Sequence, residues 1–152
     1  MNFEFSEDQK FVQQTARDYL EEHASLDACR TALESSRPLD EELWKGVAEM
    51  GWLGAAVPEI YGGAGLGHLE LALIAEEVGR ALAPIPFAGS VYLATEALLL
   101  AGSDEQKERY LPRLVSGDLV GSFDQAALLQ VERDPGDLRR VGIMGDHDDG
   151  LA

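Results

Sequence analysis

Hydrophobic residues recur every three or four positions along most of the chain, from Ser6 to about Gly117, and this spacing predicts helices. Ser6 with Gln9 and Ser103 with Gln106 are capping-box patterns at two helix starts. The predicted helices cover about residues 6–23, 28–33, 38–50, 68–83, 87–100 and 103–117, and Pro112 is expected to bend or interrupt the last of them. We therefore predict an all-α helical bundle, with no sheet of more than two short strands within residues 6–116.

The predicted helix at residues 87–100 differs from the others because it is apolar nearly all round. Such a helix is either buried or covered by a partner. We expect part of its apolar surface to be exposed and to drive weak self-association, with Val91 and Leu98 in the contact. Glu96 interrupts the pattern, and the sequence leaves open whether it has a function or only reaches solvent at the helix edge.

The composition narrows the class of protein. The chain has 152 residues, with 12 Lys and Arg against 28 Asp and Glu, a formal net charge of −16. A nucleic-acid-binding protein needs a basic face, so we expect no nucleic-acid partner, and the same charge disfavours binding to an anionic membrane. Cys29 is the single cysteine. Without a disulfide, a signal-peptide pattern or a membrane-length apolar run, the expected location is the cytoplasm.

No motif of catalytic or metal-binding chemistry stands out from the residues alone. The glycine-rich segment at residues 62–67 lacks the third glycine of the dinucleotide-binding fingerprint, so we interpret it as a structural loop. His23, His68 and His147 have no partners at zinc-ligand spacing. The acidic run at residues 146–150 has the wrong spacing for a calcium loop. The pair Glu76 and Glu77 is expected on a solvated helix face.

Four stretches together, in the right order, resemble the acyl-CoA dehydrogenase family over roughly residues 1–123. The most specific is Gly51 to Gly65, GWLGAAVPEIYGGAG, which is similar to a loop motif of that family. The others are FSEDQ at residues 5–9, IAEEVG at 74–79, and GSDEQK with YLP at 102–112. The resemblance implies a helical N-terminal domain at residues 1–123, followed by a divergent tail at 124–152. Because residues 131–152 have few apolar positions, we expect the tail to be irregular and poorly ordered.

In that family the complete enzyme removes two hydrogens from an acyl-CoA thioester with FAD as hydride acceptor, and the N-terminal domain forms one wall of the acyl pocket. The resemblance therefore implies that Phe87, Val91 and Ala94 line the acyl chain. Ordinary core packing is the alternative for each of them. It also implies a homo-oligomer or a partner subunit.

The chain departs from the family after Phe123. The family's flavin-contacting "TEP…GSD" motif is absent, and residues 124–130 read DQAALLQ instead. We therefore expect no catalytic residue and no FAD bound to this chain alone, and whether it belongs to an active enzyme stays open. Two functions remain: the N-terminal domain of a flavin-dependent acyl-CoA dehydrogenase, inactive alone, or a non-catalytic helical interaction module derived from that family.

Overall fold

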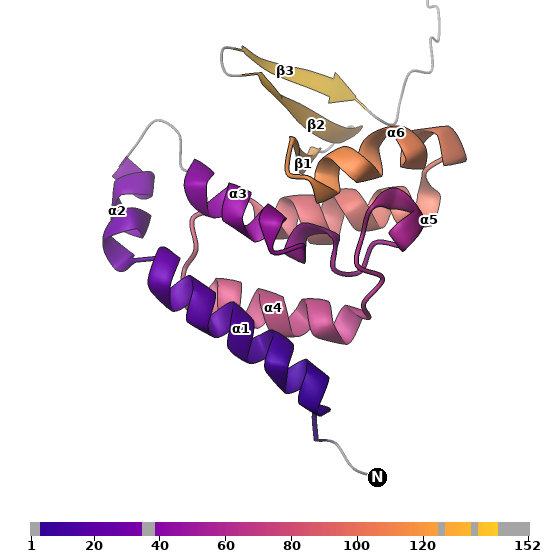
Figure 1. The fold of residues 1–152 in the computed structure, drawn as a ribbon. Helices are drawn as coiled ribbons and strands as arrows, with labels where there is room; N and C mark the ends of the chain where they lie inside the picture. The colour runs from indigo at the N-terminus through magenta and orange to yellow at the C-terminus, as the bar shows by residue number, and fades with distance from the viewer. Residues whose placement is uncertain (1–3, 35–38, 125–126, 135–136, 143–152) are drawn as a thin grey trace, which may run out of the picture.

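The computed structural model describes residues 4–34, 39–124, 127–134 and 137–142. Helices dominate the described chain, and a small sheet follows them (Figure 1). The elements are α1 (Glu7–His23), α2 (Leu26–Glu34), α3 (Glu41–Glu49), the 3₁₀ turns η1 (Trp52–Gly54) and η2 (Glu59–Tyr61), α4 (His68–Arg80), the π-helix η3 (Ala88–Thr95), α5 (Glu96–Ala101), α6 (Asp104–Val115), β1 (Leu119–Asp124), β2 (Ala127–Asp134) and β3 (Asp137–Gly142).

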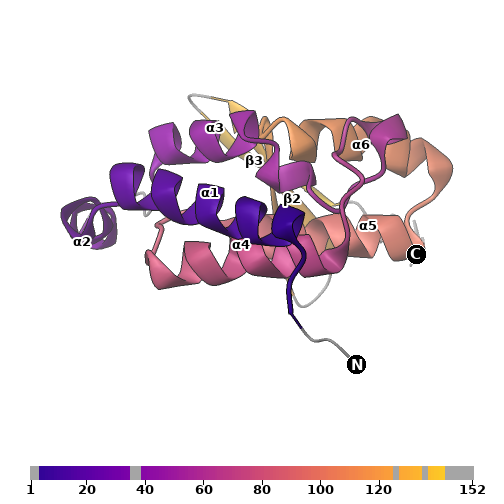
Figure 2. The same cartoon turned by 60° about the horizontal axis from the view of Figure 1, so that its bottom comes forward.

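The helices pack around one apolar interior. α1 lies along α4 on one side of it, and α3 lies on the other (Figures 1 and 2). Trp44 and Val47 of α3 are fully buried, and so is Leu71 of α4. The Trp44 indole Nε1 donates a 2.9 Å hydrogen bond to the carbonyl oxygen of Gly117, which ties α3 to the turn after α6. None of the helices in the described residues is long and apolar enough to cross a bilayer.

The predicted helix starts are confirmed in atomic detail. The Ser6 hydroxyl accepts a 3.2 Å hydrogen bond from the Gln9 amide, and the Gln9 side chain accepts one of 2.9 Å from the Ser6 amide. Ser103 and Gln106 form the same reciprocal pair. Both boxes satisfy backbone donors that have no partner inside the helix. Within the described residues between 6 and 116 there is no strand, so the all-α prediction for this span is confirmed.

Two helix predictions need correction. Pro112 does not interrupt α6, which continues to Val115. The reason is that Leu111 and Leu114 on either side of it are buried, and this packing holds the last turn despite the missing backbone donor. The single helix predicted at residues 87–100 is instead divided into η3, a π-helix, and α5.

The segment predicted to be irregular contains strands. β1, β2 and β3 form an antiparallel sheet in that order, with Val120 opposite Val131 and Gln130 opposite Val141. Residues 127–134 and 137–142 of this segment are therefore strands, and whether the tail is poorly ordered stays a prediction. The strands were not predicted because this segment has few apolar positions. Strand formation also depends on pairing with neighbouring strands, which composition alone does not show. The remaining tail, residues 143–152, lies outside the described part of the chain.

Candidate functional site

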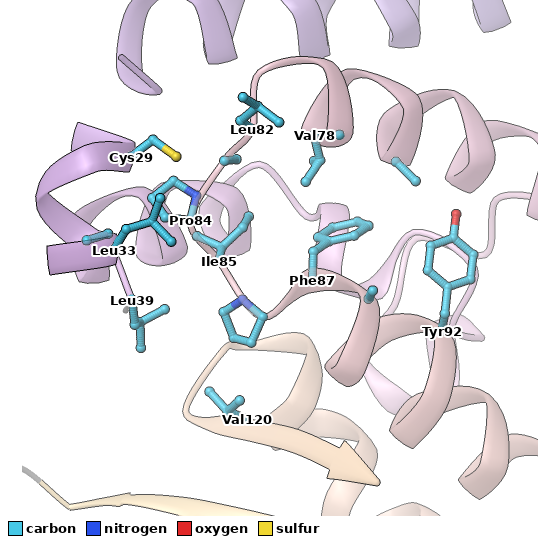
Figure 3. Close-up of a pocket in the computed structure, with 16 residues that line it drawn as sticks. Cys29, Leu33, Leu39, Val78, Leu82, Pro84, Ile85, Phe87, Tyr92 and Val120 are labelled. Atoms are coloured by element: carbon cyan, nitrogen blue, oxygen red, sulfur yellow. The ribbon is translucent and has the colours of Figure 1, made fainter. Parts of the chain in front are cut away.

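The helices enclose an open apolar groove of about 770 Å³. It lies between α2, the end of α4, the segment that joins α4 to η3, and β1 (Figure 3). Its lining contains no charged side chain, and this makes it a surface for an apolar ligand rather than an ionic one. The residues labelled around it in Figure 3 are Cys29, Leu33, Leu39, Val78, Leu82, Pro84, Ile85, Phe87, Tyr92 and Val120.

The connection from α4 to η3 shapes the middle of the groove. Leu82 has a φ of 50°, in the left-handed region that a residue with a branched side chain rarely adopts. The turn is held because the Ala83 amide donates to the Val78 carbonyl at 3.2 Å, and the Asp40 amide donates to the Pro84 carbonyl at 3.0 Å. The predicted helix at residues 68–83 includes Leu82. In the structure the helix ends at Arg80, two residues before Leu82, and the Leu82 side chain is 59% exposed.

Phe87 lies at the start of η3, with its ring directed into the groove (Figure 3). The ring meets Tyr92 edge to face, with 6.3 Å between centroids. The Tyr92 hydroxyl donates a 3.1 Å hydrogen bond to the Leu71 carbonyl, which fixes the second ring. Burial raises the pKa of Tyr92 above its ordinary value, and the negative charge of Glu96 raises it further. The phenol is therefore neutral, and this end of the groove carries no charge.

The three residues implied as an acyl-pocket wall occupy different places. Phe87 lines the groove, although it is 3% exposed and also belongs to the main core. Val91 is only 3% exposed and belongs to the main core, whereas Ala94 is fully buried and packs in a second core cluster with Leu98. Neither Val91 nor Ala94 is among the residues that line the groove. A direct contact between a ligand and these two therefore stays a prediction, and the described geometry supports it most strongly for Phe87.

The sequence analysis missed the part of the groove that α2 supplies. Cys29, Ala32 and Leu33 of this helix all line the groove. Their spacing of three and four residues is the signal of one helix face, and the short helix predicted at residues 28–33 already contained it. Val120 of β1 also lines the groove, and no helical pattern could have placed it there.

The prediction that Glu76 and Glu77 both lie on a solvated helix face is wrong for Glu77. Its side chain is fully buried, although Glu76 beside it is exposed. Arg17 of α1 reaches both carboxylate oxygens of Glu77, at 2.8 and 3.2 Å, and Arg80 Nε lies 2.6 Å from Oε2. Hydrogen bonding from Arg17 holds the pKa of Glu77 below its ordinary value, with Arg80 adding to the effect and burial opposing it. The Glu77 carboxylate can be buried because it is paired with two arginines.

Glu96 lies at the edge of the bundle rather than within it. Its side chain is 21% exposed, and one oxygen lies 3.0 Å from Nε2 of His68, whose side chain is 72% exposed. The contact joins the start of α4 to the start of α5. Within the described residues, no three His, Cys, Asp or Glu side chains gather closely enough to hold a metal ion.

The glycine-rich loop is a structural element. The amides of Gly63, Ala64, Gly65 and Leu66 donate to the carbonyls of Pro58, Gly54, Val57 and Ala55. A Cβ on Gly63 would collide with the backbone of Val57, so the chain passes itself too closely for any other residue. Because these amides are already used, the loop does not fit the pyrophosphate of a dinucleotide such as FAD, which needs free backbone donors.

Comparison with known proteins places this fold in a family. Residues 6–118 match the family model described as the acyl-CoA dehydrogenase N-terminal domain. The mitochondrial isovaleryl-CoA dehydrogenase of Pongo abelii is 35% identical over 120 residues, which cover 78% of this chain and 28% of the relative.

Two solved structures are similar to the described fold. The acyl-CoA dehydrogenase of Bacillus anthracis complexed with FAD is 36% identical, with a TM-score of 0.66 over 75% of this chain and 20% of that one. The ChsE4-ChsE5 complex of Mycobacterium tuberculosis is 28% identical, with a TM-score of 0.66 over 78% of this chain and 30% of that one. The chain thus spans less than a third of the length of each of these relatives. It belongs to the acyl-CoA dehydrogenase family, and residues 6–118 correspond to that family's N-terminal helical domain.

Proposed function

We propose that this chain is the helical acyl-binding domain of a flavin-dependent acyl-CoA dehydrogenase, an enzyme that introduces a double bond into an acyl-CoA thioester. The observation that carries the proposal is the apolar groove bordered by Phe87, on a chain whose residues 6–118 match the N-terminal domain of that family. A groove of about 770 Å³ without a charged lining suits the hydrocarbon part of such a substrate.

In this proposal the three residues implied as an acyl-pocket wall have two roles. Phe87 contacts the acyl chain, because its ring faces the groove. Val91 and Ala94 form the layer behind it, where their near-complete burial keeps the wall rigid. The domain's contribution is to bind and orient the acyl chain and to exclude water from it.

The proposal assigns no chemical step to the described residues. In the family FAD supplies the hydride acceptor, but the amides of Gly63, Ala64, Gly65 and Leu66 in the glycine loop here are already bonded to other backbone carbonyls. We therefore place the flavin and the catalytic base outside residues 4–142. The chain alone is accordingly expected to bind acyl groups without oxidising them.

A second function from a different class is a non-catalytic interaction module. It is favoured by Leu93 and Leu100, which are 50% and 83% exposed on η3 and α5. These side chains suit a contact with a second copy or a partner subunit.

In either case we propose that the chain forms a homo-oligomer or pairs with a partner subunit. The ChsE4-ChsE5 complex among the similar structures supports this. A cytoplasmic location is also part of the proposal, although one relative is named as mitochondrial.

Isothermal titration of the purified chain with octanoyl-CoA and with free CoA tests the proposed function. We expect octanoyl-CoA to bind and free CoA not to bind at the same concentrations. Phe87→Ser should weaken octanoyl-CoA binding several-fold, because it replaces an apolar ring that borders the groove with a small polar side chain.

Leu98→Ser is the matched control, since it removes a buried apolar side chain that does not line the groove. Circular dichroism of each variant checks that it folds, and Phe87→Leu gives a milder change at the same position. Equal binding of CoA and octanoyl-CoA would contradict the proposal. So would the same loss of affinity in both serine variants. A chain that ignores octanoyl-CoA but dimerises through Leu93 and Leu100 would support the interaction module instead.

A further inference from the structure

One side chain holds the outer edge of the first strand. β1 is an edge strand, with β2 on one side of it. On the other side, the Ser90 hydroxyl of η3 accepts a 3.0 Å hydrogen bond from the Gly121 amide and lies 3.3 Å from the Gly121 carbonyl, to which it donates. Ser90 is only 2% exposed, so both contacts are shielded from water. A single hydroxyl thus satisfies the two backbone groups that a further strand would otherwise pair.

Small residues allow the strand to approach η3 this closely. A Cβ on Gly121 would collide with the Cβ of Ala94, and a Cβ on Gly89 would lie 3.2 Å from the Gly121 carbonyl oxygen. Any larger residue at Gly121 would push β1 away from Ser90. The two hydrogen bonds and the close backbone contact therefore depend on each other.

The π-helical geometry presents Ser90 to the strand. The hydroxyl of Thr95 donates a 2.8 Å hydrogen bond to the Ser90 carbonyl, five residues back in the sequence. This bond satisfies a carbonyl in the widened turn, and Thr95 is itself buried. Turns of this kind are rare and are often found at functional sites, where the insertion redirects a side chain.

The strand position has a consequence for the groove. Val120, directly before Gly121, lines the groove together with Phe87, and Phe87 lies one turn before Ser90. Figure 3 shows the Val120 side chain on β1 and the Phe87 ring at the start of the helix, and both residues line the groove. We propose that Ser90 is a positioning residue that fixes Val120 relative to Phe87 and so sets the width of the apolar groove. The part of this inference that concerns ligand binding rests on the proposed function.

Hydrogen exchange of the backbone amides in the purified chain tests the positioning role without any ligand. Ser90→Ala removes both hydrogen bonds to Gly121, and the Gly121 amide is expected to exchange at least about tenfold faster than in the original chain. Ser90→Cys keeps the size but has a weaker acceptor, so an intermediate rate is expected. Ser103→Ala, which removes a capping serine from α6, is the matched control and should leave the Gly121 amide protected after correction for global stability.

Titration with octanoyl-CoA then measures the effect on the groove. Ser90→Ala should weaken octanoyl-CoA binding several-fold, and Ser103→Ala should not. An unchanged Gly121 exchange rate in Ser90→Ala would overturn the positioning role, whatever the ligand data show. Faster exchange with unchanged octanoyl-CoA affinity would overturn the link to the groove. If the original chain does not bind octanoyl-CoA, the proposed function fails, and the exchange data still decide whether Ser90 positions the strand.

Discussion

The buried carboxylate of Glu77 offers the sharpest test of what holds α1 against α4. It is fully buried, and its oxygens accept hydrogen bonds from Arg17, Arg80 and Gln13. Gln13 and Arg17 belong to α1, so three of the contacts at this carboxylate join the two helices. Removing the charge should therefore loosen the α1–α4 contact specifically.

The size of the effect depends on which partner is removed. Glu77→Gln keeps one acceptor but loses the charge-assisted bonds, and since both arginines can turn to water we expect a loss of about 2 kcal/mol in the free energy of unfolding. The double variant Arg17→Met with Arg80→Met leaves the carboxylate buried without a cation. That variant should lose about 3–5 kcal/mol. Adding Glu77→Leu to it removes the stranded charge and should restore most of the loss.

Urea unfolding followed by tryptophan fluorescence measures these differences, because Trp44 and Trp52 are both buried in the core. Glu76→Gln is the matched control: the same chemical change at the neighbouring exposed position should alter stability by less than about 0.5 kcal/mol. Equal effects of the two glutamine variants would refute the reasoning. A triple variant that is less stable than the double variant would refute the reasoning as well. The loss of stability in the double variant could then not come from the unpaired charge of Glu77.

The same carboxylate predicts a pH dependence. Because the pKa of Glu77 is lowered in the folded state, its stabilisation is complete above the ordinary glutamate pKa of about 4.3 and is lost as the pH falls from there through the folded-state value. Glu77→Gln lacks this titration. The stability gap between the two proteins should therefore be widest at neutral pH and should close in acid. A gap independent of pH would contradict the assignment.

Four further predictions follow from other contacts. Trp44→Phe, which leaves the Gly117 carbonyl without its buried donor, should lower the free energy of unfolding by about 1–3 kcal/mol in urea titrations. Gly121→Ala should lower the thermal midpoint because its Cβ meets Ala94. Leu93→Asp with Leu100→Asp should shift a weak dimer toward monomer in sedimentation at tens of micromolar, and a clean monomer before substitution would contradict the exposed-face argument. The purified chain should show no flavin absorbance and reduce no dye with octanoyl-CoA, and a stoichiometric yellow chromophore after gel filtration would contradict this.

Local sequence signals predicted most of the helical part. The capping residues Ser6 and Ser103 interact only within their own turn, so their pattern is complete in the sequence. Gly51, which directly follows the predicted helix at residues 38–50, has a φ of 75°, and this left-handed conformation is typical of a glycine after a helix end. These features depend on a few adjacent residues, and such features can be predicted without knowing the tertiary structure.

Features that depend on distant residues were missed. Glu77 is on the face of α4 that meets α1, and its burial depends on Arg17, sixty positions away. Val91 and Leu98, expected to take part in self-association, are 3% and 1% exposed because neighbouring helices cover them. The π-helix is another case, since Ser90 bonds to a strand thirty-one residues later. Helical periodicity records that a residue is apolar, but it does not show which element covers it.

The candidate groove was predicted in part. Phe87 was expected to face a ligand, and its ring does line the groove. The expectation came from resemblance to a family, however, and it did not distinguish Phe87 from Val91 and Ala94, which do not line the groove. The opposite side of the groove, with Cys29 on α2, depends on how α2 folds back beside the segment after α4, and no local pattern describes that arrangement.

Intermolecular nuclear Overhauser measurements between octanoyl-CoA and the isotope-labelled chain test the central claim most directly. If the groove binds the acyl chain, the octanoyl methylene protons should give cross-peaks to the Phe87 ring and to the Val120 methyl groups, because both residues line the groove. Free CoA should give none at these positions. Cross-peaks only to Leu93 and Leu100 on the exposed face, or no cross-peaks at saturating octanoyl-CoA, would contradict the account.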